Sequence, residues 1–322
     1  MSSLGSQLFA AEFYVYYNNG IPIYRSTYEI KPFFEFTSIA KFSWEMPKAQ
    51  LIKIRSGKVP VVLVHGIDPM EIYGVWTDYK KKFIEAWKRL LPNNFALYIF
   101  IYPSLDVPIE DSAEIFFEEV SKLEGKVNIY AHSMGGILLR YALQREELVK
   151  KISKIIFAGT PHIGSPLANF VVADKDILKL RSDWEFIKTV LLIANVSGGF
   201  TQAPNYKYIS IGFENPQIPE NVHFVNFAAR IKNDAATTVS NLLNTEFFTS
   251  FGLESLNRVT KILYPPNSEF VENDGMVPLS SAIYFGNAKI FDGYDHSDLA
   301  YYDIIVNEAI KEFSLTEVTE QQ

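Results

Sequence analysis

Short apolar runs alternate with helix-like patterns between residues 59 and 158, and few folds accommodate that order. The run at 59–64 is continuous and β-branched, which is typical of a strand buried on both faces of a parallel sheet. Alternation of this kind predicts an α/β fold with a mostly parallel central sheet and helices on both faces. Ligands then bind beyond the carboxyl ends of the strands. The further strands are expected at 96–101, 127–130 and 152–158, and the helices at 76–91, 111–123 (capped by Asp111) and 135–144.

The residues outside this alternation are expected to belong to the same domain. Residues 1–50 are predicted to be an N-terminal β extension, with a turn at Asn19-Gly20, and residues 315–322 a C-terminal tail. The main domain, 51–314, leaves more than a hundred residues between its strand at 152–158 and the acidic segment at 272–278. One crossover needs only about a dozen residues. The surplus predicts a helical cap over the site, formed by insertions at about 166–219 and 233–266.

Composition excludes several classes of function. The 322 residues carry a net charge of −7 with no basic segment, so nucleic acid is not an expected partner. The absence of cysteine excludes disulfides, thiolate metal sites and a cysteine nucleophile. No stretch approaches the roughly 20 apolar residues of a transmembrane helix. Residues 1–7 lack the features of an export signal, which leaves a cytoplasmic location, or an extracellular one if a leader has been removed.

A candidate nucleophile lies in the segment V-N-I-Y-A-H-S-M-G-G, residues 127–136. Here a strand is followed by a sharp turn and a helix, and Ser133 lies in the turn. A nucleophile elbow requires small residues two positions before and two after its serine, so that strand and helix can pack closely. Ala131 and Gly135 occupy those positions. The pattern therefore predicts that Ser133 attacks the substrate, and the alternative is a serine that only caps the helix.

An oxyanion hole is predicted beside this serine. One backbone N–H is expected from Met134, the residue after the nucleophile, and the other from Ile67 in the loop that follows the strand at 59–64. Two such dipoles, fixed before the reaction, stabilise the negative charge that develops on the carbonyl oxygen. His65, at the start of that loop, is expected to be structural.

The general base must follow Ser133, because chain order in such a site is serine, acid, histidine. His162 has no suitable carboxylate between itself and the serine, and His223 opens a strand-like run at 223–231. His296 is therefore the predicted base. It lies on a loop between a last strand at 287–291 and a final helix at about 299–313.

Asp274, in the segment E-N-D-G-M-V-P at 272–278, is the predicted acid. A buried carboxylate there would hold the imidazole of His296 in one tautomer and stabilise its charged form. Two rivals stay open. Asp234 lies just past the strand at 223–231, and Asp295 is adjacent to His296, too close in sequence to face the ring easily.

Five motifs together resemble the bacterial true lipases and the broader group of lipase-like α/β hydrolases. The resemblance extends from residue 59 to about 313. It implies Ser133, Asp274 and His296 as catalytic residues, with Ile67 and Met134 at the oxyanion hole. The secretory leader of that family is missing here, and the disulfide of some members cannot form without cysteine. The motifs are H-G-I at 65–67, A-H-S-M-G-G at 131–136, T-P-H-I-G-S at 160–165, N-D-G-M-V-P at 273–278 and D-H-S-D at 295–298.

The resemblance also raises the question of calcium. Some members of the family bind the ion near the catalytic histidine, with one carboxylate two residues after it. Asp298 matches that position, but no partner carboxylate is evident, and Asp298 could instead cap the final helix. No cofactor is expected to be required.

These residues predict a serine carboxylic-ester hydrolase of the lipase or esterase type, which acts through an acyl-enzyme on a small-molecule or lipid ester. An acyltransferase, a thioesterase or an amidase would use the same residues, and a binding protein would use only the fold. Apolar cap residues, Leu191 and Phe248 among them, are expected to bind the acyl chain. Medium- to long-chain esters, with contact to a lipid interface, are the expected substrates.

Overall fold

A hairpin stands at the N-terminal end of the computed structural model. Strand β1 (Glu12–Asn18) pairs antiparallel with β2 (Ile21–Thr27), and Asn19 and Gly20 separate them in sequence. The expected pairing of these two runs is therefore found, whereas their membership of the main domain stays a prediction. The structure describes residues 48–68, 71, 75–105, 107–166, 168, 204–231 and 271–320, together with the backbone of the two hairpin strands.

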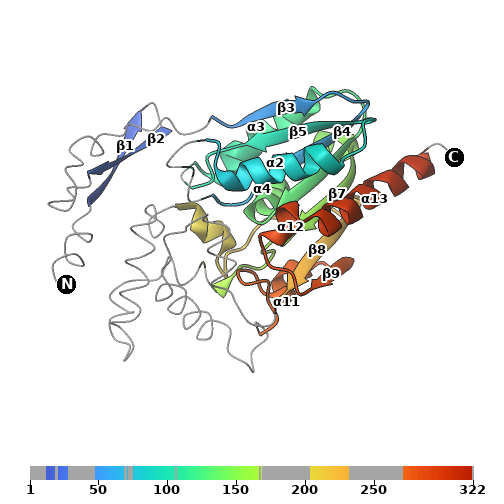
Figure 1. The fold of residues 1–322 in the computed structure, drawn as a ribbon. Helices are drawn as coiled ribbons and strands as arrows, with labels where there is room; N and C mark the ends of the chain where they lie inside the picture. The colour runs from blue at the N-terminus through green and yellow to red at the C-terminus, as the bar shows by residue number, and fades with distance from the viewer. Residues whose placement is uncertain are drawn as a thin grey trace.

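A seven-stranded sheet forms the centre of the molecule (Figure 1). Its order is β3-β5-β4-β6-β7-β8-β9, and every pair is parallel except that of β3 with β5. The mostly parallel sheet is as expected, and the antiparallel edge strand β3 is an addition to it. The bounds are β3 Gln50–Arg55, β4 Val59–Val64, β5 Phe95–Ile101, β6 Val127–His132, β7 Ile152–Ala158, β8 Phe224–Arg230 and β9 Ala288–Asp292.

Burial of the strands follows their place in the sheet. All six residues of the central strand β6 are buried, and so are five of the six in β4. Both faces of these strands meet helices, which explains their continuous apolar sequence. The edge strand β9 instead alternates between exposed and partly buried residues, because β8 is its only partner strand among the described residues.

Two apolar cores lie on opposite faces of the sheet, since successive residues of a strand point to opposite sides. Val62, Ile129 and Ile155 face a core that includes α3 (Ile109–Ser121) and α4 (Met134–Ala142). Val61, Tyr130 and Ile156 face the other core, which includes α2, α12 and α13. The bounds of this second group are α2 Asp78–Leu90, α12 Asp298–Tyr301 and α13 Asp303–Glu320.

The helices differ from the expectation in three respects. Helix α3 begins at Ile109 after Pro108, so Asp111 lies in its first turn and does not cap it. The final helix is two helices, because Tyr302 has an extended backbone (ψ 131°) between α12 and α13. Unpredicted short elements also appear among the described residues: α5 (Glu146–Lys151), α11 (Leu279–Ala282) and the 3₁₀ helix η2 (Pro204–Ile209).

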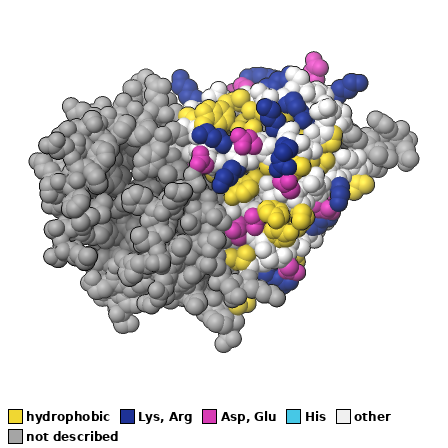
Figure 2. Space-filling view, viewed as in Figure 1, with side chains coloured by type: hydrophobic (Ala, Val, Ile, Leu, Met, Phe, Trp, Pro, Cys, Tyr) yellow, Lys and Arg dark blue, Asp and Glu magenta, His cyan; other side chains and the backbone are white. Residues whose placement is uncertain are grey.

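Basic and acidic side chains are interspersed on the described part of the face drawn in Figure 2, and they form no continuous basic patch there. Nucleic-acid binding would need such a patch. Among the described residues, no helix combines the length and the apolar character that crossing a bilayer requires.

Candidate active site

Three side chains from distant parts of the chain meet beyond the carboxyl ends of the parallel strands. Ser133 directly follows β6, Asp274 lies in the segment after β8, and His296 follows β9. The Nε2 atom of His296 is 2.9 Å from the Ser133 Oγ, and its Nδ1 is 2.6 Å from the Asp274 Oδ2. The structure therefore brings together the three residues that the sequence singled out.

Ser133 has a strained backbone, with φ 55° and ψ −129°. Positive φ is uncommon for a residue with a side chain, and it occurs here between the end of β6 and the first residue of α4. Two neighbouring glycines make room for this turn. A Cβ atom on Gly135 would lie 2.5 Å from the His65 carbonyl oxygen, and one on Gly66 would lie 2.6 Å from the Ser133 Cβ. Larger residues would thus push the elbow away from the loop after β4.

The hydrogen bonds of Asp274 fix the tautomer of His296. Asp274 Oδ1 accepts the backbone N–H groups of Met276 (2.9 Å) and Val277 (2.7 Å), so the carboxylate is held in place. Its Oδ2 accepts the hydrogen on His296 Nδ1. His296 Nε2 is then free of hydrogen and able to accept the Ser133 proton. Asp274 and His296 are each 1% exposed, and the backbone N–H of His296 also donates to the Asp274 carbonyl (2.9 Å).

Met134 and Ile67 are the residues whose backbone N–H groups were predicted to form the oxyanion hole. Met134 is the first residue of α4, where N–H groups have no partner within the helix. Ile67 lies three residues beyond the end of β4 and is partly buried. Within the described part of the chain, neither N–H donates to another backbone or side-chain group. An oxyanion hole requires donors without a partner in the free protein, and the assignment of these two residues to one stays a prediction.

The remaining histidines have other environments. His65 is buried and donates from Nδ1 to the Gly66 carbonyl (2.7 Å), and burial, with Lys80 nearby, holds its pKa well below its usual value. His162 donates from Nε2 to Asn226 Oδ1 (2.9 Å), and burial lowers its pKa to about 3. His223 is exposed, and its carbonyl accepts the N–H of Ile155 in β7. None of these three rings is bonded to Ser133.

Asp295 and Asp234 were the two alternatives to Asp274 as the acid. Asp295 turns away from the His296 ring: its Oδ1 accepts the N–H groups of Ser297 (2.8 Å) and Asp298 (3.0 Å). Asp234 lies outside the described residues, as do Leu191 and Phe248 and most of the expected cap.

Asp298 starts α12, and its Oδ2 accepts the backbone N–H of Asp295 (3.0 Å). Burial raises its pKa. In the ranges that the structure describes, no three His, Asp or Glu side chains are placed to hold a metal ion. The described residues thus provide no partner carboxylates that would join Asp298 in the calcium site that the family resemblance raised.

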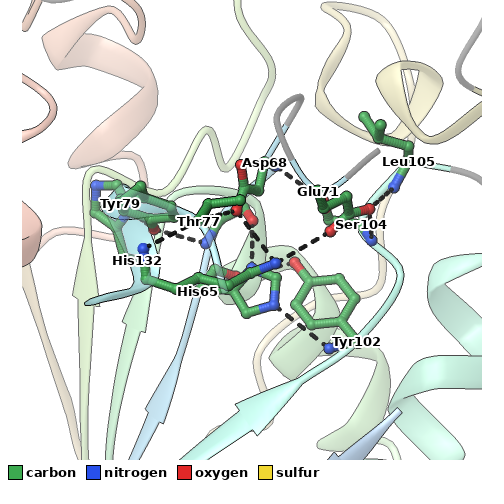
Figure 3. A network of polar contacts seen from close by, with 11 residues as sticks. His65, Asp68, Glu71, Thr77, Tyr79, Tyr102, Ser104, Leu105 and His132 are labelled. Atoms are coloured by element: carbon green, nitrogen blue, oxygen red, sulfur yellow. Dashed lines mark hydrogen bonds and ion pairs between the residues drawn. The ribbon is translucent and has the colours of Figure 1, made fainter. Parts of the chain in front are cut away.

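A buried polar cluster behind the loop after β4 was not predicted (Figure 3). Lys80 Nζ, fully buried on α2, lies 3.1 Å from Asp68 Oδ2 and 3.3 Å from Glu71 Oε2. Glu71 Oε1 also accepts the N–H of Ser104 (2.6 Å). Burial raises the pKa of Glu71 to about 7, although Lys80 opposes this shift. The sequence gives little signal for such a cluster, because a lysine beside an apolar helix face ordinarily reaches solvent.

A family model described as the PGAP1-like alpha/beta domain matches residues 100–244, less than half of the chain. The metagenomic carboxyl esterase MGS0156 matches 84% of this chain and 78% of its own, at 16% identity and a TM-score of 0.51. The mature form of the Bacillus licheniformis lipase BlEst2 matches 82% and 97%, at 18% identity and a TM-score of 0.47. No curated protein matches the sequence.

At such low identities the structural matches show the fold alone, and the esterase match, with its TM-score above 0.5, shows the α/β-hydrolase fold. This confirms the fold class expected from the sequence. Together with the family-model match, it supports the lipase-like α/β-hydrolase family that the five motifs indicated, and a hydrolase as the general class of protein.

Proposed function

We propose that this chain, a lipase-like α/β hydrolase, is a serine carboxylic-ester hydrolase that acts through an acyl-enzyme. One observation carries the proposal, namely that the His296 ring is hydrogen-bonded on both sides. Its Nε2 is 2.9 Å from the Ser133 Oγ, and its Nδ1 is 2.6 Å from the Asp274 Oδ2. A serine, a histidine and an acid in this order are the groups that nucleophilic acyl transfer requires.

In the first half of the proposed reaction, His296 Nε2 takes the Ser133 proton while Oγ attacks the ester carbonyl. The N–H groups of Met134 and Ile67 bind the resulting oxyanion, and the Asp274 carboxylate stabilises the imidazolium. His296 then gives its proton to the leaving alcohol. In the second half, His296 takes a proton from water while the water oxygen attacks the acyl carbonyl. The bond to Ser133 then breaks, His296 returns the proton to the Ser133 Oγ, and the carboxylic acid leaves.

The substrates proposed are medium- to long-chain acyl esters or lipids. The support is the apolar composition of the cap sequence, which includes Leu191 and Phe248, together with the esterase whose fold this chain shares. Contact with a lipid interface is part of this proposal.

A fluorophosphonate probe and a panel of p-nitrophenyl esters test the proposal. The probe should modify Ser133 alone, as located by peptide mass spectrometry. Ser133→Ala should lose both labelling and ester turnover by several orders of magnitude while keeping its circular dichroism spectrum. Ser112→Ala is a matched control, because it removes a buried hydroxyl that has no hydrogen-bond partner among the described residues.

Labelling at a different serine would contradict the assignment of the nucleophile. Preferential turnover of thioesters, of amides or of an alcohol acceptor over simple ester hydrolysis would retain the acyl-enzyme and replace the proposed reaction by thioester hydrolysis, amide hydrolysis or acyl transfer. Retained turnover in Ser133→Ala would overturn the proposal as a whole.

A further inference from the structure

The Tyr79 hydroxyl lies between the loop after β4 and the residue before Ser133 (Figure 3). It is 2.9 Å from the backbone N of Gly66 and 2.6 Å from Nδ1 of His132. The other ring nitrogen of His132, Nε2, is 2.9 Å from the backbone carbonyl oxygen of His296. Tyr79 and His132 thus connect the backbone just before Ile67 with the backbone of the proposed base.

The two backbone groups at the ends of this chain of hydrogen bonds, the Gly66 N–H and the His296 carbonyl, determine the direction of every hydrogen bond between them. The Gly66 N–H can only donate, so the Tyr79 oxygen accepts there. The His296 carbonyl can only accept, so Nε2 of His132 carries a hydrogen. Neutral His132 then has no hydrogen on Nδ1 and accepts the Tyr79 hydroxyl hydrogen. Burial, and next the proximity of His296, hold the pKa of His132 well below its usual value, which keeps the ring neutral.

We propose that Tyr79 and His132 are positioning residues that hold the Ile67 oxyanion donor and His296 in their relative places. This inference rests on the proposed function. Both side chains are buried, Tyr79 at 5% and His132 at 1% exposure, so water does not readily replace a lost bond. The two residues act together because the same Tyr79 oxygen bonds to Gly66 and to His132.

His132 also borders the base directly. The centroids of the His132 and His296 rings are 4.8 Å apart, with an interplanar angle of 46°. During the proposed reaction His296 becomes an imidazolium, and a second positive charge at this distance would oppose it. Two further rings contact His132, those of Tyr79 and Phe83 on α2, and neither of these side chains carries a negative charge that would favour a protonated His132.

Tyr79→Phe tests the oxyanion end of this connection. The variant leaves the Gly66 N–H and His132 Nδ1 without a partner, and kcat should fall about 10-fold or more with little change in KM. Inhibition by a boronic acid that mimics the tetrahedral intermediate should weaken by the same factor. Tyr130→Phe is the matched control, since it also removes one buried hydroxyl, which bonds to the Leu299 carbonyl and not to Gly66 or His132. Equal effects of the two variants on kcat would overturn the proposal.

Two substitutions of His132 test the other end. A glutamine amide retains a donor that can reach the His296 carbonyl, whereas leucine retains none, so His132→Gln should keep more activity than His132→Leu. The double variant Tyr79→Phe/His132→Leu should cost little more than the more damaging single change, because both act on one chain of hydrogen bonds. Additive losses, or equal activity of the Gln and Leu variants, would contradict a shared positioning role.

A third measurement does not depend on ester turnover. In ¹⁵N-histidine-labelled protein at pH 7, the His132 signals should be those of a neutral ring with its hydrogen on Nε2. Finding the hydrogen on Nδ1 would overturn the proposed connection even in an active enzyme. The proposed function could also fail while the positioning role holds. In that case the His132 ring has the expected tautomer and the fluorophosphonate labels Ser133 more slowly in Tyr79→Phe, but the protein hydrolyses no ester. Such a result would show that the proposed substrate is wrong.

Discussion

Asp274 is the residue whose hydrogen bonds most directly determine the chemistry of the proposed site. One carboxylate oxygen is held by the N–H groups of Met276 and Val277, and the other accepts from His296. Replacing Asp274 by Asn would place its NH₂ either opposite His296 Nδ1 or against the N–H groups of Met276 and Val277. The second arrangement sets donors against a donor, so the first is favoured, and it disfavours the tautomer in which His296 Nε2 can accept the Ser133 proton.

We therefore expect Asp274→Asn to lower kcat by about 10⁴-fold with a smaller change in KM. Steady-state kinetics on one p-nitrophenyl ester measure both constants. Asp295→Asn is the matched control, because its carboxylate bonds to the start of α12 and not to the His296 ring. Should Asp234→Asn reproduce the loss while Asp274→Asn leaves kcat intact, the acid would be Asp234.

At this scale the sequence predicted more of the proposed triad than of its surroundings. Ser133, Asp274 and His296 occur in motifs of fixed chain order, which a single sequence reveals. Tyr79 and His132 carry no such signal, because their contacts join residues 53 positions apart and depend on how α2 packs on the sheet. His132 was considered only as a histidine that precedes the serine, and its bond to the His296 carbonyl is visible only in three dimensions.

Among the elements, buried strands were predicted more closely than helix ends. The bounds of β4 and β7 agree with the expected runs, because burial on both faces selects continuous apolar sequence. Helix termini depend on a few backbone contacts. Pro108 fixes the start of α3 two residues before the region expected from Asp111, and the break at Tyr302 has no marker such as Gly or Pro in the sequence.

The connection from β4 to α2 contains a buried carboxyl group, that of Glu71, whose raised pKa should make the stability of the protein depend on pH. Glu71 has a pKa of about 7 in the folded protein, against 4.5 for the ordinary group. Between these values the folded state holds a proton that the unfolded state has lost. Stability should therefore fall as pH rises from about 5 to 7.5, by up to about 3 kcal/mol from this residue.

Glu71→Gln cannot ionise, and its amide oxygen can still accept the Ser104 N–H. The free energy of unfolding of the variant should therefore lack this part of the pH dependence. Between pH 5 and pH 7.5, wild type should lose stability that the variant keeps, so the difference between the two should shift in favour of the variant. Urea unfolding at a series of pH values measures the effect. Glu85→Gln removes an exposed carboxylate from α2 and should follow the wild-type curve. Parallel curves for Glu71→Gln and wild type would show that Glu71 does not have a raised pKa.

For the molecule as a whole, the main untested expectation concerns the cap sequence. If Leu191 and Phe248 bind the acyl chain, each buried CH₂ contributes up to about 0.8 kcal/mol, and kcat/KM should rise from acetyl to medium-chain esters. Replacing Leu191 or Phe248 by Ser should flatten this rise more than it slows acetate hydrolysis. Ile304→Ser, an exposed site on α13, should leave the profile unchanged. Acetate as the best substrate, insensitive to the two cap substitutions, would indicate an esterase with a purely structural cap.

The order of the site residues along the chain has a consequence for the newly made protein. Ser133 and its loop come from the first half of the sequence, whereas Asp274 and His296 come from the last fifty residues. The two ends meet when α12 and α13 pack on α2, where the Trp87 indole donates to the Ala300 carbonyl at 3.2 Å. A chain still emerging from the ribosome therefore has its serine long before it has its base. Under the proposed mechanism, Ser133 becomes reactive only after the segment that carries His296 has been made, so a shorter polypeptide would not hydrolyse esters.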